Sequence, residues 1–201
     1  MAAPAFRADE RINLANAEVV LADGHAEGLE LLAQIFAGFG VMTPHRCAKP
    51  EAVEEVARQR EINLFVIDSL LDGGSGYDAV RWLRHSGLKP NAFAPVILIT
   101  GHTRASEVFR ARDCGANFVI RKPATPTVML QRIVWVSREA RKFVQSPGYA
   151  GPDRRFQMLG PPVGEKGRRS DDLSVDVGAA TTPNLDQSDI DALFQPKKAI
   201  G

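Results

Sequence analysis

The sequence predicts an α/β fold with a doubly wound parallel sheet, and three features of the chain lead to this prediction. Short apolar runs alternate with helix-like segments from Ala17 to about Val144, as in repeated βα units. Polar residues directly follow four of these runs, as they do where parallel strands end at a ligand crevice. The alternation stops near Ser146, so the 201 residues indicate one domain with an extension.

The first half of the domain is expected to hold three strands and two helices. A strand over 19–22 leads to a helix whose apolar residues recur at helical spacing and which ends at Gly40. A weaker strand over 41–47 contains a proline and is therefore expected at an edge or to be irregular. A polar helix over 50–60 precedes the third strand, 62–67.

The second half continues the alternation. Its last helix has the clearest start, because Thr125 is a favoured N-cap and Pro126 a favoured first helical residue. Gly115 marks the end of the helix before it. The expected elements are a helix over 77–84, a strand over 95–99, a helix over 105–113, a strand over 117–120 and a helix from Pro126 to about Phe143.

Composition argues against several classes of protein. The net charge of +1 provides no basic field of the kind that a dedicated DNA-binding protein uses. The N-terminus lacks the apolar core of a signal peptide, and no run approaches membrane-spanning length. Cys47 and Cys114 form no metal-type cluster, which favours reduced thiols. We therefore expect a cytoplasmic protein with neither DNA nor membrane as its partner.

After Ser146, Gly, Pro and charged residues replace the periodic pattern, and such a stretch cannot bury enough apolar area to offset its ordering entropy. We expect a flexible N-terminus over 1–14, one folded domain over 15–145, a mostly disordered linker over 146–184 and a short amphipathic helix over 185–196.

Four polar residues stand at the ends of four predicted strands: Asp23, Asp68, Thr100 and Lys122. If these strands are parallel, two carboxylates, a hydroxyl and an ammonium group meet at one edge of the sheet. An aspartate can attack phosphorus when a cation and a lysine balance the charge on the phosphoryl oxygens. Mg²⁺ prefers oxygen ligands and keeps several waters, so few protein oxygens suffice. The pattern predicts a site that handles a phosphoryl group.

These residues, in this order over about 17–144, resemble the receiver domain of bacterial two-component response regulators, the CheY-like family. The resemblance implies a flavodoxin-like five-stranded sheet in the order 2-1-3-4-5 and a role in a phosphorelay. Asp68 would be the phosphoacceptor, charged by a histidine kinase or phosphotransfer protein. Thr100 would be the switch hydroxyl, and Lys122 would contact the phosphoryl group and precede a candidate cis bond to Pro123. Mg²⁺ would bind Asp23, Asp68 and the backbone carbonyl of Leu70.

The sequence departs from this family at three positions. Gly24 follows Asp23, where the family usually has a second acid that binds the metal directly. Asp72 stands where the loop usually has proline. It either restores some negative charge to the site or, as we favour, is a solvated loop residue. Val119 replaces an aromatic residue that often moves with the threonine, while Phe118 is expected in the core.

The four histidines are candidates for modulating the site or for metal binding. His25 and His102 are expected in loops close to it, and His45 and His85 show no partner spacing. An ordinary loop or surface role is the simpler interpretation for all four.

Two features of the C-terminal extension remain. Residues 185–194 resemble the short N-terminal segment of flagellar motor switch proteins, which docks on an activated chemotaxis receiver as a helix in a groove. Ile190, Leu193 and Phe194 would form the contact face, either with this chain's own receiver or with another protein. A fraying terminal helix is the alternative. The arginine pairs at 154–155 and 168–169 are either phosphate ligands or, as we favour, solvated charges.

The sequence shows no DNA-binding output domain, so we expect signalling through contact with another protein. A pseudo-receiver scaffold or adaptor that works without phosphorylation is the alternative, and Gly24 is its best support. An enzyme with an aspartyl intermediate would need Asp72 as general acid, and we do not expect one.

Overall fold

A computed structural model describes residues 13–137, 142–153 and 185–194 of the chain. Its centre is a sheet of five parallel strands in the order β2-β1-β3-β6-β7, which confirms the predicted fold class and strand order. The strands are β1 Val19–Ala22, β2 His45–Cys47, β3 Leu64–Asp68, β6 Val96–Thr100 and β7 Phe118–Arg121.

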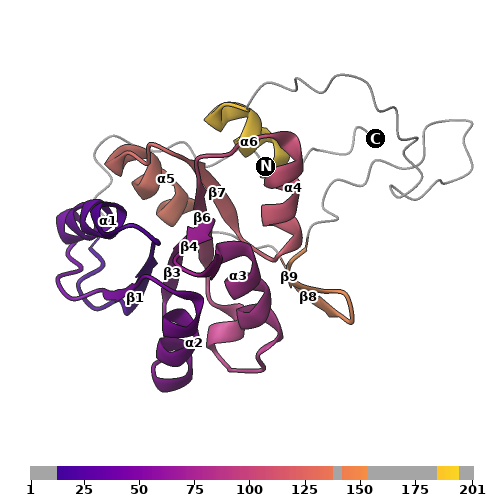
Figure 1. The fold of residues 1–201 in the computed structure, drawn as a ribbon, viewed down its shortest axis with the longest axis horizontal. Coiled ribbons are helices and arrows are strands. Elements are labelled where there is room, and N and C mark those ends of the chain that lie inside the picture. The colour runs from indigo at the N-terminus through magenta and orange to yellow at the C-terminus, as the bar shows by residue number, and fades with distance from the viewer. Residues whose placement is uncertain (1–12, 138–141, 154–184, 195–201) are drawn as a thin grey trace, which may run out of the picture.

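Helices cover both faces of this sheet (Figure 1), with α1 and α5 on one side and α2, α3 and α4 on the other. The helices are α1 Ala26–Gly38, α2 Pro50–Gln59, α3 Gly76–His85, α4 Ala105–Asp113 and α5 Pro126–Ser137. A 3₁₀ turn, η1, covers Asn91–Phe93. Every residue of β1, β3 and β6 is buried, because a parallel sheet between two helical layers has no solvent face.

Short elements follow the local sequence as expected. Gly40 and Gly115 adopt the left-handed conformation, with φ of 95° and 98°, just after α1 and α4. The Thr125 hydroxyl accepts a hydrogen bond from the Val128 N–H at 3.3 Å, which caps α5. The second strand is shorter than expected and covers only His45–Cys47, directly after Pro44.

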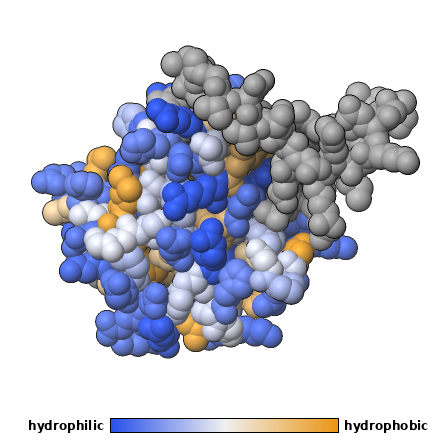
Figure 2. Space-filling model, turned by 45° about the vertical axis from the view of Figure 1, so that its right-hand side comes forward, coloured by the Kyte–Doolittle hydropathy of each residue, from blue (hydrophilic) through white to orange (hydrophobic). Residues whose placement is uncertain are grey.

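Hydrophilic residues cover most of the face in Figure 2, and hydrophobic residues interrupt it in small groups. In the described part of the chain, no helix is long and apolar enough to cross a membrane.

The structure differs from the expectation beyond α5. The helix was expected to continue to about Phe143, but Phe143–Ser146 is a strand, β8, that pairs antiparallel with β9 Tyr149–Pro152. A linker beginning at residue 146 is therefore wrong for residues 146–152. All of β9 is buried, and the Tyr149 hydroxyl donates to the Pro152 carbonyl at 2.6 Å. Residues 154–184, with both arginine pairs, lie outside the described part.

The hairpin lies beside Arg84, a buried cation on α3 that is satisfied by neutral acceptors. Its Nε donates to the Gly115 carbonyl at 2.9 Å, and its Nη2 donates to the Asn117 side chain at 2.9 Å. Its Nη1 donates to the Ala92 and Ala94 carbonyls, at 2.9 and 2.7 Å. Burial lowers the pKa of Arg84 to about 10. This side chain ties α3 to the loops before β6 and β7.

The Phe143 ring adds to this environment, because it lies 5.3 Å from the Arg84 guanidinium carbon. Gly115 is also required here, since a Cβ on it would lie 2.4 Å from the Ala150 carbonyl oxygen of β9. The hairpin thus closes over a polar cluster that the sheet alone would leave exposed to water.

We expect Arg84→Lys to lower the free energy of unfolding by about 2–4 kcal/mol, because one ammonium group cannot replace the guanidinium fork. Urea denaturation measures the loss. Arg81→Lys is the matched control, since among the described residues the Arg81 side chain forms an exposed ion pair with Asp78 on the same helix, worth under about 1 kcal/mol. Equal losses for the two variants would contradict this role of Arg84.

Candidate functional site at the carboxyl edge of the sheet

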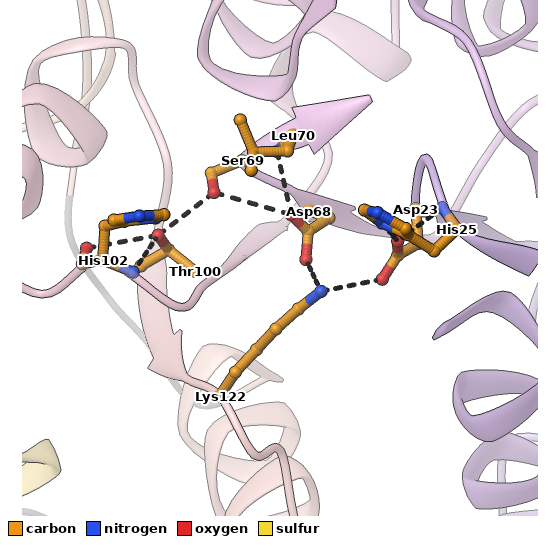
Figure 3. A network of polar contacts seen from close by, with 8 residues as sticks. All are labelled: Asp23, His25, Asp68, Ser69, Leu70, Thr100, His102 and Lys122. Carbon is orange, nitrogen blue, oxygen red and sulfur yellow. Dashed lines mark hydrogen bonds and ion pairs between the residues drawn. The ribbon is translucent and has the colours of Figure 1, made fainter. Parts of the chain in front are cut away.

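The parallel register brings the four strand-end residues together. Asp23 follows β1, Asp68 ends β3, Thr100 ends β6 and Lys122 follows β7 (Figure 3). Asp23, Asp68 and Thr100 are almost completely buried. Three neighbouring strands thus present two carboxylates and a hydroxyl at one point, as the sequence predicts.

Lys122 bridges the two carboxylates. Its Nζ lies 3.0 Å from Asp23 Oδ2 and also forms an ion pair with Asp68 Oδ2. Its backbone N–H donates to the Thr100 carbonyl at 2.8 Å, and its bond to Pro123 is cis. Although burial opposes it, contact with Asp68 and Asp23 raises the pKa of Lys122, so the ammonium form is favoured.

Asp68 is held by its own loop as well as by Lys122. Its Oδ1 accepts the Leu70 N–H at 2.8 Å, and Gly76 is required behind it, because a Cβ there would lie 1.9 Å from the Asp68 carbonyl oxygen. Burial raises the pKa of Asp68, with Asp23 adding to this rise and Lys122 and Leu70 opposing it. The carboxylate therefore carries a desolvation cost that a further cation or donor would relieve.

Thr100 is engaged with the loop that follows it. Its hydroxyl donates to the His102 carbonyl at 3.2 Å and accepts the His102 N–H at 3.1 Å. The Ser69 hydroxyl also donates to Thr100 Oγ1 at 3.1 Å and lies 3.5 Å from Asp68 Oδ1. Ser69 is a site residue that the sequence analysis missed, and its only signal is a hydroxyl next to the candidate acceptor.

The expected metal ligands meet only in part. The carboxylates of Asp23 and Asp68 both contact Lys122 and therefore lie close together. Two acidic ligands suit a cation that keeps most of its waters. The Leu70 carbonyl, however, accepts the Gly24 N–H at 3.2 Å. A Cβ on Gly24 would lie 2.8 Å from the Asp72 nitrogen and 2.9 Å from the Leu71 carbonyl carbon. The loop thus fills the space beside Gly24, and within the described residues no cluster of three His, Cys, Asp or Glu side chains could hold a metal.

The same loop forms a small antiparallel pair, β4 Leu70–Leu71 with β5 Gly74–Ser75, which the sequence analysis did not include. Asp72 at its tip is exposed and lies 3.5 Å from Lys49, and its N–H donates to the Ala48 carbonyl at 2.9 Å. This placement agrees with a solvated loop residue.

Two histidines touch the site. The His25 N–H donates to Asp23 Oδ1 at 2.9 Å, and its exposed ring lies 3.4 Å from the same oxygen. His102 contacts Thr100 only through its backbone. Away from the site, His45 pairs with Glu18 at 2.7 Å and His85 bonds to the Arg81 carbonyl at 2.8 Å.

A C-terminal helix lies near the site. This helix, α6 Gln187–Phe194, packs against β7 beside α4 (Figure 1). Ile190 and Phe194 are buried, Leu193 is partly buried against the same core, and the Phe194 ring lies 5.8 Å from that of Phe118. The predicted contact face therefore packs on this chain's own receiver.

The chain is similar in sequence to known response regulators. The model of the response regulator receiver domain family matches residues 19–134. The response regulator PmrA of Pseudomonas aeruginosa is 32% identical over 113 residues, which are 56% of this chain and 46% of PmrA. NarP, the nitrate/nitrite response regulator of Escherichia coli, is 26% identical over 119 residues, 58% of this chain and 53% of its own. This chain thus spans about half the length of the curated relatives it matches.

Solved structures share the fold. The chemotaxis protein CheY4 of Vibrio cholerae aligns with a TM-score of 0.54 at 16% identity, covering 60% of this chain and 98% of CheY4. The BeF₃-activated DrrB receiver domain aligns with a TM-score of 0.52 at 20% identity, covering 61% and 98%. Strand order, the edge with its acid, acid, hydroxyl and lysine, and the family match agree, and the chain belongs to the response regulator receiver domain family.

Proposed function

We propose that this receiver accepts a phosphoryl group on Asp68 from a histidine kinase or phosphotransfer protein and signals through contact with another protein. The observation that carries this proposal is the buried contact of Asp68 with Lys122, which Asp23 shares and beside which Thr100 lies. Two of the relatives that the chain matches are named as response regulators, which supports a signalling role rather than an enzymatic one. We also propose a cytoplasmic location, where the receiver would meet the histidine kinase or phosphotransfer protein.

The side chains suit the transfer step. An Asp68 oxygen attacks phosphorus while the P–N bond to the donor histidine breaks, and its electron pair stays with the imidazole nitrogen. Lys122 is already placed to balance the negative charge of the phosphoryl oxygens. The Leu70 N–H, 2.8 Å from Asp68 Oδ1, adds a fixed donor. The hydroxyls of Ser69 and Thr100 lie on the same side of the carboxylate.

Mg²⁺ is the cofactor that this site would take. Asp23 and Asp68 would hold it, and the Leu70 carbonyl would join them after giving up its hydrogen bond from the Gly24 N–H. When bound, Mg²⁺ neutralises charge on the phosphoryl oxygens. Because Gly24 stands where the family usually has a second acid, the site attracts the ion more weakly than the family pattern would. Gly24 therefore also favours the second candidate function, a receiver scaffold or adaptor that works without phosphorylation.

We expect acetyl phosphate with Mg²⁺ to add one phosphoryl group to the full chain and none to Asp68→Asn, because Asp68 is the buried nucleophile. Intact-protein mass spectrometry detects the adduct. Asp72→Asn is the control and is expected to react as the unmodified chain does. Labelling that persists in Asp68→Asn would contradict this assignment, and no labelling of the unmodified chain would favour the scaffold function.

We also expect Asp68→Asn to increase the free energy of unfolding at pH 7, by about 1 kcal/mol, because it removes a buried carboxylate next to Asp23 while Lys122 keeps its ion pair with Asp23. Burial raises the pKa of Asp68 in the folded chain, so ionising it weakens the fold as pH rises. The gain in the variant should therefore shrink as pH falls towards the unfolded pKa of about 3.9. Urea denaturation at several pH values tests this, and a gain that grows on acidification would contradict it.

Mg²⁺ binding should depend on both acids. Asp23→Asn is expected to weaken the affinity for Mg²⁺ by about tenfold, which is about 1.4 kcal/mol, because only one carboxylate would then remain in the site. Isothermal titration calorimetry with MgCl₂ measures it. Asp72→Asn, on the exposed loop, should leave the affinity unchanged. An unchanged affinity in Asp23→Asn would place the ion elsewhere.

A further inference from the structure

The contact between α6 and the receiver is specific as well as apolar. The α6 face is the surface formed by Thr103, Phe118, Val119, Arg121 and Arg132. At its centre, β7 is the edge strand of the sheet, so its outer backbone groups need partners from outside the sheet.

Gln187 supplies partners for two of these backbone groups. Its Nε2 donates to the Val119 carbonyl at 3.0 Å, and its Oε1 accepts the Arg121 N–H at 2.8 Å. One amide side chain thus pairs with the edge of β7 as a neighbouring strand would. Such a two-point contact fixes the position of α6 along the strand.

One turn further along α6, Asp191 forms an ion pair with Arg132 of α5. Both side chains are largely buried, and Gln187 Nε2 also donates to Asp191 Oδ1 at 3.0 Å. Removing one partner of a buried ion pair strongly destabilises the fold, because the other charge stays buried without compensation. The face therefore selects a helix with Gln and Asp four residues apart, besides the apolar Ile190 and Phe194.

The start of the helical segment is tied to the loop that leaves the phosphoryl site. The Leu185 N–H donates to the Thr103 carbonyl at 2.8 Å, and the Thr103 hydroxyl donates to the Leu185 carbonyl at 2.8 Å. Three residues earlier, Thr100 is bonded to the backbone of His102 at both its N–H and its carbonyl. The segment 100–103 thus carries the site hydroxyl at one end and the anchor of α6 at the other.

We propose that α6 is the resident ligand of the α6 face and that a phosphoryl group on Asp68 releases it through the segment 100–103. This inference rests on the proposed acceptance of a phosphoryl group by Asp68. To donate to that group, the Thr100 hydroxyl must give up its bond to the His102 carbonyl, and the backbone that aligns Thr103 with Leu185 then loses part of its support. Release exposes Ile190, Phe194 and the α6 face together.

The coupling is reciprocal. If a phosphoryl group on Asp68 weakens docking of α6 by some factor, docked α6 disfavours the phosphorylated state by the same factor. The docked helix therefore keeps the receiver in its unphosphorylated form, and losing α6 shifts the receiver towards the form that accepts the group.

Hydrogen exchange of the full chain, followed by mass spectrometry on peptides covering 185–194, tests the release. Acetyl phosphate with Mg²⁺ is expected to speed exchange there about fivefold or more, the effect of one net hydrogen bond, and to change nothing in Asp68→Asn. A chain that carries the phosphoryl group without faster exchange would overturn the inference while leaving the proposed function intact. A chain that gains no phosphoryl group contradicts the proposed function instead.

Two variants test the same link without phosphorylation. Thr100→Val removes the bonds to His102, and Thr103→Val removes the hydroxyl bond to Leu185, so each should speed exchange of 185–194 severalfold. Ser188→Ala is the matched control, because Ser188 lies on the exposed side of α6 and its hydroxyl bonds, within the described part of the chain, to Asp186 at 2.7 Å. Unchanged exchange in Thr100→Val would overturn the coupling. Protection that rises with protein concentration would place the helix of a second copy on the face and overturn the resident role.

Discussion

The ammonium group of Lys122 is the contact on which the site depends. Two buried carboxylates on neighbouring strands repel each other, and neither has solvent to reduce the cost of its charge. Lys122 reaches both from the loop after β7, so one cation joins the ends of β1, β3 and β7. Because Lys122 offsets part of their charge, these acids can remain buried and close together. One ammonium group for two carboxylates leaves Asp68 without full charge compensation, which suits its proposed role as phosphoacceptor.

A second tie, Arg84, holds the opposite end of the sheet. Its guanidinium bonds to carbonyls before β6 and β7, while Lys122 acts at the carboxyl ends of the strands. Arg84 has four neutral acceptors and carries no reactive partner among the described contacts, so it serves rigidity. Lys122 has two charged partners, and in the proposed function it balances the charge of the phosphoryl group. Under that proposal, one cation supports the stability of the sheet and the other supports the chemistry at its carboxyl edge.

Much of the fold and of the site edge follows from sequence because the responsible signals are local. Buried parallel strands appear as continuous apolar runs, and the residues just after them must lie at one edge, as Asp23, Asp68 and Thr100 do. The hairpin over 143–152 was missed because Tyr149–Pro152 has no strand-like pattern, and its burial depends on Gly115 and Arg84, which are distant in sequence. Ser69 was missed because a single hydroxyl beside an acid has no distinctive spacing. The amphipathic pattern predicted a helix near the C-terminus, but the backbone edge of β7 that Gln187 recognises carries no side-chain signal.

The covalent connection of α6 to the receiver sets a threshold for any competitor. A ligand on the same chain meets its surface at an effective concentration that the covalent connection sets, and this value does not change with the amount of protein in the cell. A separate protein that presents a similar helix must therefore bind the surface more tightly than α6 does, or be present at a comparable concentration, in order to displace it. With α6 docked, partners of ordinary affinity are excluded at every expression level. Selectivity at this surface is in that sense a property of chain connectivity as much as of contact chemistry.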